Sequence, residues 1–474
     1  MYKVVIGLEV HCELKTKAKV FSSAPNYYNK IPNENIALGD LGFPGTLPAV
    51  NKKAVALALK MALALDCEIP RELLFDRKNY FYPDLPKGYQ ITQVTKPLGK
   101  NGVLIVNVEG IDKEVQIKQL HLEEDTASLD HFDDYSLLDY NRSGVPLVEI
   151  VTEPCLHSSK EVLAFLEALR SIYLYCDVSE ARTDQGQMRC DVNVSLMKET
   201  DQELGTKVEM KNINSFNNVK DAIEYEIKRQ TELLNNNQKV IMETRRFDDD
   251  KRKTYSMRTK AEAVDYKYFI DPNLPPIDLP LNFIEEIKKT IPKLQYERIN
   301  IYMKEYNLSR YDATILVKEK EIADYFEEAL TYTKNYQTLV NWINGIILGH
   351  LNKYELSIKE LFITPKMLVE LISQVDGGFI SIKQGKKVLY ESLEKGKAPL
   401  DIIKTSNISQ ITDEDQIKEF VKEVLEENEN LILEYKNGRN NVLDYLIGQI
   451  MKKSRGKANP ALSSKVLKEE IEKR

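Results

Sequence analysis

The sequence contains no run of about 18 consecutive apolar residues, which is the length that a membrane-spanning helix requires. Its five cysteines are widely scattered and include no C-x-x-C pair, so nothing indicates a disulfide framework. Residues 4–6 already form an expected strand, without the apolar segment of a secretory signal. We therefore expect a cytoplasmic protein with reduced thiols.

The two common phosphate-binding loops are also missing. Neither G-x-x-x-x-G-K-[ST] nor G-x-G-x-x-G occurs in the chain. A bound nucleotide would therefore have to be held by basic side chains on a sheet. The candidates for this ATP or phosphate site are Arg189, Lys207 and Lys211, with Glu209 between the two lysines. The alternative is that these bases only balance nearby acids.

The composition is that of a soluble globular protein. The chain has 474 residues, of which 42% are hydrophobic and 29% are charged, enough for about two to four domains. The net charge of −7 argues against a surface coated by nucleic acid. The charge is uneven, however, because residues 438–474 contain nine basic and four acidic side chains, a formal charge of +5.

Four short stretches alternate between apolar and polar residues, and they carry the main functional signal. They are residues 8–14, 146–151, 189–196 and 207–211. Successive side chains of a strand point to opposite faces, so one face can join the core while the other lines a cleft. That cleft would contain carboxylates, an imidazole, Lys and Arg. Carboxylate oxygens suit Mg²⁺ and the bases suit phosphate, which predicts a metal–nucleotide site on an antiparallel sheet.

The predicted metal ligands, which are also the candidate catalytic residues, come from these stretches and from residues 123–125. They are Glu9, His11, Glu124, Glu149 and Asp191. A single acid on a strand is more often a solvated surface residue. Glu149, however, interrupts an otherwise apolar strand, and a buried carboxylate needs a cation or a hydrogen-bond donor. We therefore expect the five side chains to surround one Mg²⁺-sized site.

Two neighbouring glutamates compete for one place in this set. Glu124 is preferred to Glu123 because it continues the apolar face of the strand that ends here, where a carboxylate would need a cation. Leu120 and Leu122 form that apolar face. The choice between the two glutamates stays open.

The helical and strand patterns indicate an α+β fold. Short strands fill the first part of the chain, together with expected helices near 50–65, after the capping residue Ser158, and near 218–234. A proline-rich stretch at 271–280 is typical of a linker, and the remaining chain has only helical patterns. We expect a mainly antiparallel-sheet domain, an all-helical domain and a small helical tail. Their expected bounds are 1–290, 291–404 and 405–474.

Two basic segments remain ambiguous. Residues 77–89 interleave bases with aromatic side chains, which suits either stacking on nucleotides or core packing with turns. Residues 243–248 suit either a loop that reaches phosphate or a strand held by ion pairs.

The tail combines an apolar helical stripe with a basic end. The stripe is formed by Ile417, Phe420, Val421, Val424 and Leu425. Because the stripe is needed for the tail's own core, the bases remain available for solvent or phosphate. The side chains expected to contact phosphate are Lys452, Lys453, Arg455 and Lys457. The alternative is that these lysines only keep a helix end soluble.

Longer motifs give the chain a family resemblance. They occupy residues 6–11, 75–84, 121–125, 141–151, 189–193, 205–212, 243–248, 448–452 and 457–460. In these motifs, and along essentially its whole length, the chain closely resembles the B subunits of the bacterial aspartyl/glutamyl-tRNA(Asn/Gln) amidotransferases. Some members carry a zinc-type cysteine cluster after the first strand, but residues 21–25 contain no cysteine here, so no zinc is expected.

The resemblance implies a carbon–nitrogen ligase that works as a heterotrimer and takes its amide nitrogen from glutamine. The B subunit would use ATP and Mg²⁺ to phosphorylate the side-chain carboxylate of Glu-tRNA(Gln) or Asp-tRNA(Asn). Ammonia from the glutaminase (amidase) partner, the A subunit, would then displace the phosphate, while a small C subunit joins the other two. In family terms, residues 1–290 would be a cradle domain for kinase and amidation chemistry, followed by a helical domain and a tRNA-contacting tail.

Two other functions compete with this one. A metal-dependent RNA phosphoesterase would use the same acids without an aminoacyl group, and a non-enzymatic tRNA-binding scaffold would use only the basic tail. Strict alternation of acids with apolar residues argues against the scaffold. The sequence leaves open which mischarged tRNA is used, the tRNA identity elements and the route of ammonia.

Overall fold

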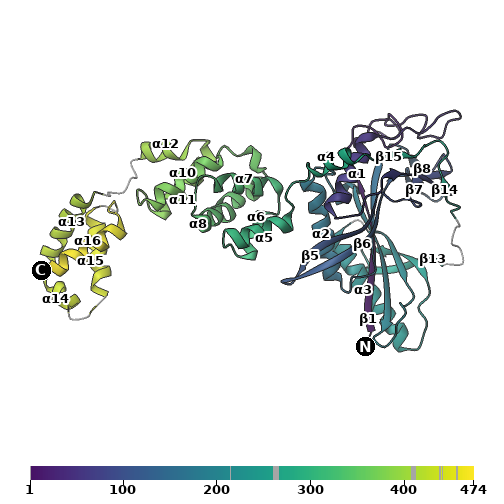
Figure 1. Cartoon of the computed structure of the whole chain (residues 1–474). Helices are drawn as coiled ribbons and strands as arrows, with labels where there is room; N and C mark the ends of the chain where they lie inside the picture. Colours follow the sequence, from purple (N-terminus) through teal and green to yellow (C-terminus); the bar gives the residue numbers. More distant parts are fainter. Residues whose placement is uncertain are drawn as a thin grey trace. The chain divides into compact units, whose positions relative to one another are not determined.

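The computed structural model describes residues 2–213, 215–259, 266–406, 413–436, 439, 441–454 and 457–473. The chain divides into two compact units, Met1–Glu297 and Arg298–Arg474. The first unit contains the sheets and the second is helical, which confirms the predicted α+β class (Figure 1). The unit boundary lies near the predicted one at residue 290. The separate tail beginning at residue 405 stays a prediction.

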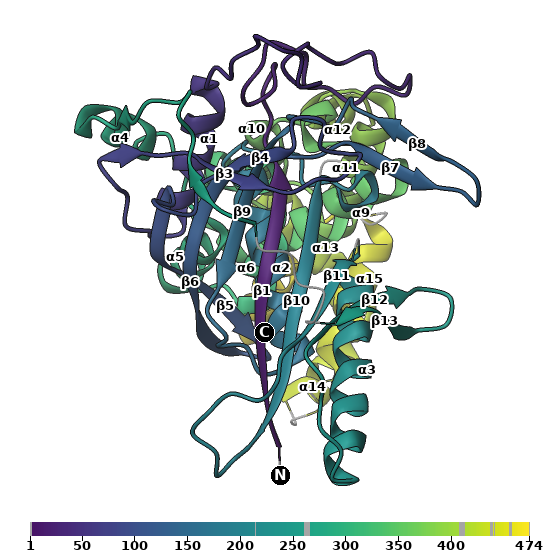
Figure 2. The same cartoon turned by 90° about the vertical axis from the view of Figure 1, so that its right-hand side faces the viewer.

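The first unit is built on an eight-stranded sheet. Its strand order is β13-β12-β11-β10-β1-β9-β6-β5. The strands are β1 (Tyr2–Glu13), β5 (Gly99–Val108), β6 (Ile111–Glu124), β9 (Pro146–Thr152), β10 (Met188–Lys198), β11 (Val208–Ile213), β12 (Glu243–Asp248) and β13 (Lys253–Thr259). All neighbours pair antiparallel except β11 and β12, which are parallel. Figure 2 shows β1 in the middle of this sheet, between β9 and β10.

Helices cover one face of this sheet. They are α1 (Lys52–Ala64), α2 (Ser159–Tyr175) and α3 (Phe216–Asn235), close to the three predicted positions. As predicted, Ser158 begins α2, and its hydroxyl accepts a hydrogen bond from the backbone N–H of Glu161 at 3.2 Å. Such a cap satisfies one of the amide groups left unpaired at the start of a helix.

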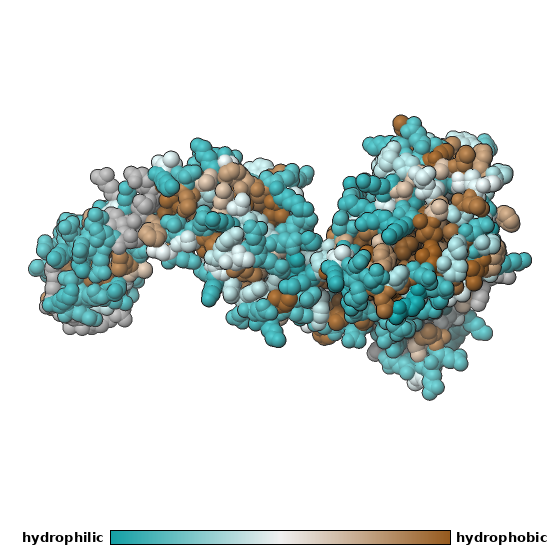
Figure 3. All heavy atoms as spheres, turned by 45° about the horizontal axis from the view of Figure 1, so that its top comes forward, coloured by the Kyte–Doolittle hydropathy of each residue, from teal (hydrophilic) through white to brown (hydrophobic). Residues whose placement is uncertain are grey.

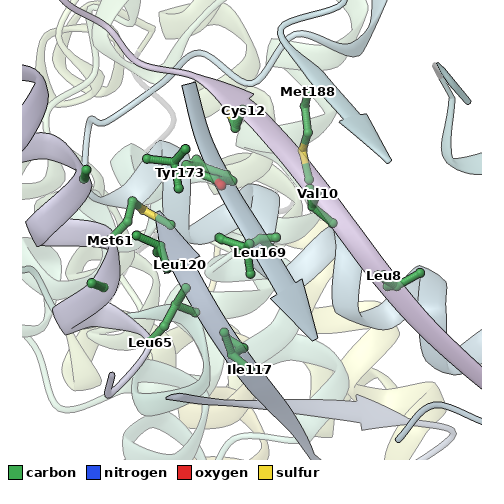
Figure 4. Packing of buried hydrophobic residues seen from close by; sticks show 14 of the residues in the cluster. Leu8, Val10, Cys12, Met61, Leu65, Ile117, Leu120, Leu169, Tyr173 and Met188 are labelled. Carbon is green, nitrogen blue, oxygen red and sulfur yellow. The ribbon is translucent and has the colours of Figure 1, made fainter. Parts of the chain in front are cut away.

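The core lies between these helices and the sheet because every second residue of each strand is apolar. Leu8, Val10 and Cys12 of β1 are at most 1% exposed and face the helices. Figure 4 shows them together with Met61 of α1 and Leu169 of α2, which belong to the same hydrophobic cluster. The intervening β1 residues therefore point to the opposite face, where the predicted polar set lies.

Shorter elements complete the first unit. The small strands are β2 (Glu72–Leu73), β3 (Asp76–Asn79), β4 (Tyr89–Thr92), β7 (Ser128–His131), β8 (Ser136–Asp139), β14 (Phe269–Ile270) and β15 (Ile277–Asp278). They pair as β14-β3-β4, β15-β2 and β7-β8. Among the described residues of this unit, the other helices are η1 (Thr183–Gln185) and α4 (Leu281–Lys288). Strand β3 lies within the ambiguous basic segment and brings it next to β4.

The second unit contains two hydrophobic clusters. The first is formed by α5 (Gln295–Glu305), α6 (Arg310–Leu316), α7 (Lys320–Leu330), α8 (Tyr336–Trp342), η3 (Ile343–Ile347), α9 (Leu348–Tyr354), η4 (Ile358–Glu360), α10 (Pro365–Asp376), α11 (Ile382–Lys395) and α12 (Pro399–Ser406). The second is formed by α13 (Glu414–Glu427), α14 (Glu429–Lys436), α15 (Asn441–Lys453) and α16 (Pro460–Lys473).

The predicted apolar stripe of the tail belongs to the second of these clusters. Ile417, Val421, Val424 and Leu425 of α13 are fully buried, and Phe420 packs against them. On the side turned to the viewer in Figure 3, the surface of α13, α14, α15 and α16 is mostly hydrophilic. Among the described residues, no helix combines the length and apolar character needed to cross a membrane.

Candidate metal and phosphate site

A cleft of about 310 Å³ opens on the face of the large sheet opposite α1, α2 and α3. Strands β6, β9, β1, β10 and β11 contribute to its lining, as do Lys78 of β3 and Gln90 of β4. Its lining consists of Glu9, His11, Lys78, Tyr80, Gln90, Glu123, Asp125, Thr126, Leu147, Glu149, Arg189, Asp191 and Lys211. Nearly all of these side chains are polar, so the cleft suits a charged ligand rather than an apolar one.

Strand register brings the predicted side chains together. Glu9 of β1 lies opposite Asp191 of β10, and His11 lies between Arg189 and Glu149 on the two neighbouring strands. Directly opposed residues on one face of a sheet have Cβ atoms about 4.5–5.5 Å apart, so their side chains can share a ligand.

One group of side chains, the histidine cluster, consists of His11, His121, Glu123 and Glu149. The ligand atoms of His11, Glu123 and Glu149 all lie within 4.8 Å of one another. His11 Nε2 is 3.5 Å from each of the two carboxylates, and His121 Nε2 is 2.8 Å from Glu149. His121 was not among the predicted site residues, although it lies on the same face of β6 as Glu123.

Charges within the histidine cluster are strongly coupled. Burial alone would lower the pKa of His11, but Glu149 and Glu123 beside it raise the pKa to about 10. The same opposing effects raise the pKa of His121 to about 10. Burial and Glu149 favour the neutral form of Glu123, yet the two histidines lower its pKa to about 2. Two imidazolium groups thus balance two carboxylates, and a divalent cation could replace their protons.

A second group, the carboxylate cluster, consists of Glu9, Asp191 and Glu209, whose ligand oxygens also lie within 4.8 Å of one another. Lys211 Nζ is 3.1 Å from Asp191 and 3.0 Å from Glu209. Burial raises the pKa of Glu9, as does Glu149, while Lys211 acts in the opposite direction. This cluster therefore holds three acids against one permanent positive charge.

Neutral donors orient the carboxylate cluster. The Asn193 amide donates to Glu9 Oε1 at 3.2 Å, and the Thr244 hydroxyl donates to Glu209 Oε2 at 2.9 Å. Both oxygens of Glu209 therefore have partners, Thr244 at Oε2 and Lys211 at Oε1. Thr244 was not among the predicted site residues, although its alternation with Arg245 in residues 243–248 was the signal for it.

Basic side chains line the same cleft. Both Arg189 and Arg142 pair with the Asp125 carboxylate, with N···O distances of 3.0 Å and 2.6 Å. The side chains of Lys78 and Lys211 also line the cleft. Burial would raise the pKa of Asp125, but Arg189 and Arg142 hold it below its usual value. Two arginines sharing one carboxylate have remaining donors for an anionic ligand.

The structure corrects the preference for Glu124. Its carboxylate contacts Lys87 Nζ at 2.6 Å and accepts the backbone N–H of Ile91 at 2.9 Å, on the opposite side of the strand from the cleft. The expectation that this carboxylate needs a cation was correct, but Lys87 supplies that cation. Glu123, one residue earlier in β6, points into the cleft and takes the place predicted for Glu124.

Other predicted residues are not brought to the cleft. Lys207 is exposed just before β11 and does not line the cleft. In the tail, Lys452 and Lys457 are exposed, whereas Lys453 pairs with Glu423 and Glu427 of α13. Arg455 lies outside the described residues.

The structure shows which elements the two ambiguous segments form: residues 243–248 are the ion-paired strand β12 rather than a loop, and residues 76–79 are strand β3. Arg77 stacks on Tyr89, 4.0 Å from the ring centroid, whereas the next residue, Lys78, lines the cleft. Within β12, Arg245 is buried in ion pairs on the helix-covered face, whereas Arg246 is exposed. Alternation along a strand allows one residue to stabilise the fold while its neighbour faces a ligand.

Fold and site together define a class: proteins that present acidic ligand clusters and flanking bases on an open antiparallel sheet. Similarity to known proteins shows which family of this class the chain belongs to. Residues 4–285 match the family described as the GatB/GatE catalytic domain, and residues 324–471 match the GatB domain.

Curated relatives cover the whole chain. It is 44% identical over 474 residues to the B subunit of the aspartyl/glutamyl-tRNA(Asn/Gln) amidotransferase of Halalkalibacterium halodurans, covering 100% of both chains. The corresponding B subunit of Caldicellulosiruptor saccharolyticus is 47% identical over 477 residues, covering 100% of this chain and 99% of the relative. The chain therefore belongs to the family of aspartyl/glutamyl-tRNA(Asn/Gln) amidotransferase B subunits, as its motifs predicted.

Proposed function

We propose that this chain is the kinase and amide-transfer component of a glutamine-dependent aminoacyl-tRNA amidotransferase, a carbon–nitrogen ligase. It would act on Glu-tRNA(Gln) or Asp-tRNA(Asn) in the cytoplasm. Its partners in a heterotrimer would be the glutaminase, or A, subunit and the small C subunit. The names of its relatives support the substrate and the assembly, and the cleft supports the chemistry.

The observation that carries the proposal is the adjacency of two acidic clusters across β1, with bases beside them. Glu9 and His11 are two residues apart on the same face of this strand, and each belongs to a different cluster. Phosphoryl transfer depends mainly on positioning and on cations around the transferred group rather than on a nucleophilic side chain. The inventory of this cleft matches that demand.

The donor set fits Mg²⁺. Five of the seven residues in the two clusters carry carboxylates, the oxygen donors that hard cations prefer. In addition, the buried Asn193 Oδ1 has no hydrogen-bond partner among the described residues. The histidine and carboxylate clusters would hold the ion or ions. When bound, Mg²⁺ would offset negative charge on the phosphates.

The chain's own residues would bind and orient the reactants. Lys211 and Arg189 would contact phosphate oxygens, with Arg142 supporting Asp125 on the other side. A carboxylate is a poor acylating agent because its leaving group would be oxide. A substrate carboxylate oxygen would instead attack the γ-phosphorus of ATP and release ADP, which gives an acyl phosphate. Ammonia would then form the C–N bond, releasing phosphate and a proton.

The source of nitrogen lies elsewhere in the assembly. The sequence contains no Gly-framed catalytic cysteine and no Ser-rich amidase loop of the kind that hydrolyses glutamine. The glutaminase partner would supply ammonia, so free ammonium salts should replace glutamine when that partner is inactive.

An amidation assay tests the proposal. The heterotrimer is incubated with Mg²⁺-ATP and Glu-tRNA(Gln), with either glutamine or ammonium chloride, and the aminoacyl product and ADP are measured. Asp191→Asn keeps the shape of the side chain but removes its charge, and should abolish product with both nitrogen donors while leaving assembly intact. Glu199→Gln, an exposed carboxylate just beyond β10, is the matched control.

Three outcomes would contradict the proposal. Wild-type amidation by Asp191→Asn with ammonia would remove Asp191 from the kinase site. Cleavage of the tRNA without amidation would support an RNA phosphoesterase. Binding of tRNA without ADP formation or cleavage would support a scaffold.

A further inference from the structure

A charged network is buried under the sheet, on the face opposite the cleft. Glu226 of α3 is 0% exposed and lies between two arginines. Arg229 donates to it at 2.6 Å, and Arg245 Nε of β12 is 3.6 Å from it. The Thr254 hydroxyl of β13 donates to the same carboxylate at 3.3 Å and accepts from Arg245 Nε at 2.8 Å. Glu226 thus connects α3 to the neighbouring strands β12 and β13.

The same strand reaches the cleft on its other face. Thr244 precedes Arg245 in β12, so its side chain points away from Glu226, and its hydroxyl donates to Glu209 Oε2. Three register pairs join β12 to β11, and among the described strands of the sheet this is the one parallel pair. Six further register pairs join β12 to β13, and the side chain of Arg245 adds contacts to Glu226 on the helix-covered face.

Stability alone does not account for this network. Burying charges costs desolvation energy, and well-packed apolar residues in place of a buried ion pair are often equally or more stabilising. Yet β12 buries Arg245 at 9% exposure above Glu226, next to a stretch of α3 that buries the apolar residues Ala222 and Ile223. What such a network supplies, and an apolar contact does not, is a defined position along the strand.

We propose that Glu226 is a positioning residue for the carboxylate cluster. It holds Arg245, and through it β12, at the place where the Thr244 hydroxyl orients Glu209. The inference rests on the proposed function only in taking the cluster of Glu9, Asp191 and Glu209 as a divalent-cation site. Partners of ligating carboxylates typically change metal affinity by about 10–100-fold when they are removed.

Metal binding tests this role without any turnover. The purified heterotrimer, free of ATP and tRNA, is titrated with Mn²⁺, which accepts the same oxygen ligands as Mg²⁺ and is counted by electron paramagnetic resonance. Glu149→Gln and Glu209→Gln assign each binding phase to the histidine or the carboxylate cluster. The Glu226→Gln variant should bind Mn²⁺ about tenfold more weakly at the carboxylate cluster, and its Mn²⁺ affinity at the histidine cluster should be unchanged.

Two further variants follow the connection step by step. Thr244→Val removes the hydroxyl but leaves the buried network intact, and should weaken the same phase. The double variant with Glu226→Gln should show no further weakening, because both changes break one chain of contacts. Arg245→Lys keeps the charge but loses the planar fork, so it should also weaken this phase selectively.

The matched control is Ile223→Val. It lies on α3 three residues before Glu226, is fully buried and packs in the same core without joining the charged network. It should lower the unfolding temperature and leave both Mn²⁺ phases at their wild-type affinities. A purely structural role for Glu226 predicts equal behaviour of Ile223→Val and Glu226→Gln.

The outcomes are separable. Wild-type Mn²⁺ affinity in Glu226→Gln and Arg245→Lys, or fully additive weakening in the double variant, would overturn the positioning role alone. If the wild type binds Mn²⁺ at neither cluster, the proposed function itself is contradicted. Should Glu226→Gln fail to assemble, Arg245→Lys decides, since it retains every charge of the network.

Discussion

The cleft and the basic tail are both rich in charge, but they hold it in different ways. In the cleft, Glu123 and Asp191 are 4% and 7% exposed and have partners at hydrogen-bond distance. In the tail, Lys452 and Lys457 are exposed to solvent. Buried charges act through geometry and change pKa values, whereas exposed charges act through a long-range field that salt screens. The two regions should therefore respond to different experimental variables.

The cleft itself contains a second contrast. The histidine cluster offsets its carboxylates with protons on two imidazoles, which a cation or a high pH can remove. The carboxylate cluster uses Lys211, whose pKa Asp191 and Glu209 raise despite the opposing effect of burial. We therefore expect the first cluster, but not the second, to exchange protons for metal.

The largest effect should come from the cleft carboxylates. Glu149→Gln and Glu209→Gln each remove one negative ligand from one cluster, and should lower kcat/KM for amidation on the order of 10²–10³-fold. Steady-state rates with ammonia as nitrogen donor measure this directly. Near-wild-type turnover for either variant would show that only one cluster takes part in catalysis.

A smaller effect should appear in the pH dependence of stability when metal is removed with EDTA. The pKa values of His11 and His121 rise from 6.5 to about 10 on folding, so their protonation stabilises the folded state. This contribution is complete below pH 6.5 and is lost as the pH rises toward 10. The unfolding temperature should therefore fall between about pH 7 and 10.

Added Mg²⁺ should make the unfolding temperature less dependent on pH, because a metal-bound imidazole is already neutral. His350→Gln provides the comparison, since this half-exposed histidine of α9 lies in the other unit and should leave the profile unchanged. An EDTA-treated protein whose unfolding temperature stays constant over the same pH range would mean that the two imidazoles are neutral in the folded state.

The smallest effect should come from single tail lysines. Lys452→Ala and Lys457→Ala should each weaken tRNA binding and lower the slope of log affinity against log salt concentration by about 0.7–0.9. Filter binding at several salt concentrations measures both quantities. Lys453→Ala should have less effect because Lys453 already pairs with Glu423 and Glu427.

Lys418→Ala is the control, because this lysine pairs with Glu414 on α13, away from the basic end in sequence. Equal slopes for all four tail variants would support the alternative that these lysines only solubilise the helix.

Much of the fold could be predicted from periodicity. Alternation in β1 separates Leu8, Val10 and Cys12 from Glu9 and His11, and the helical stripe of α13 identifies the tail core. Both patterns follow from the fixed geometry of a strand and a helix, so they need no knowledge of the neighbours. The start of α2 at Ser158 was predictable for the same reason.

Other features could not be predicted because they depend on contacts between residues that are far apart in the sequence. Glu123 and Glu124 are equivalent in composition and differ only in parity at the end of β6. Lys87, which lies 37 residues before Glu124, decides that this glutamate is paired away from the cleft. Lys207 also alternates correctly with Lys211, but β11 begins one residue after it, so its side chain is not held over the cleft.

The sequence by itself determined which side chains share a face within each strand, and its motifs determined the family. Tertiary structure decided which faces meet. Pairing of β1 with both β9 and β10 divides the acids into two clusters, and the parallel pairing of β12 brings Thr244 to Glu209. The physical reason is that alternation is a local property of the backbone. Register and strand order arise only from long-range hydrogen bonds and from the packing of a shared core.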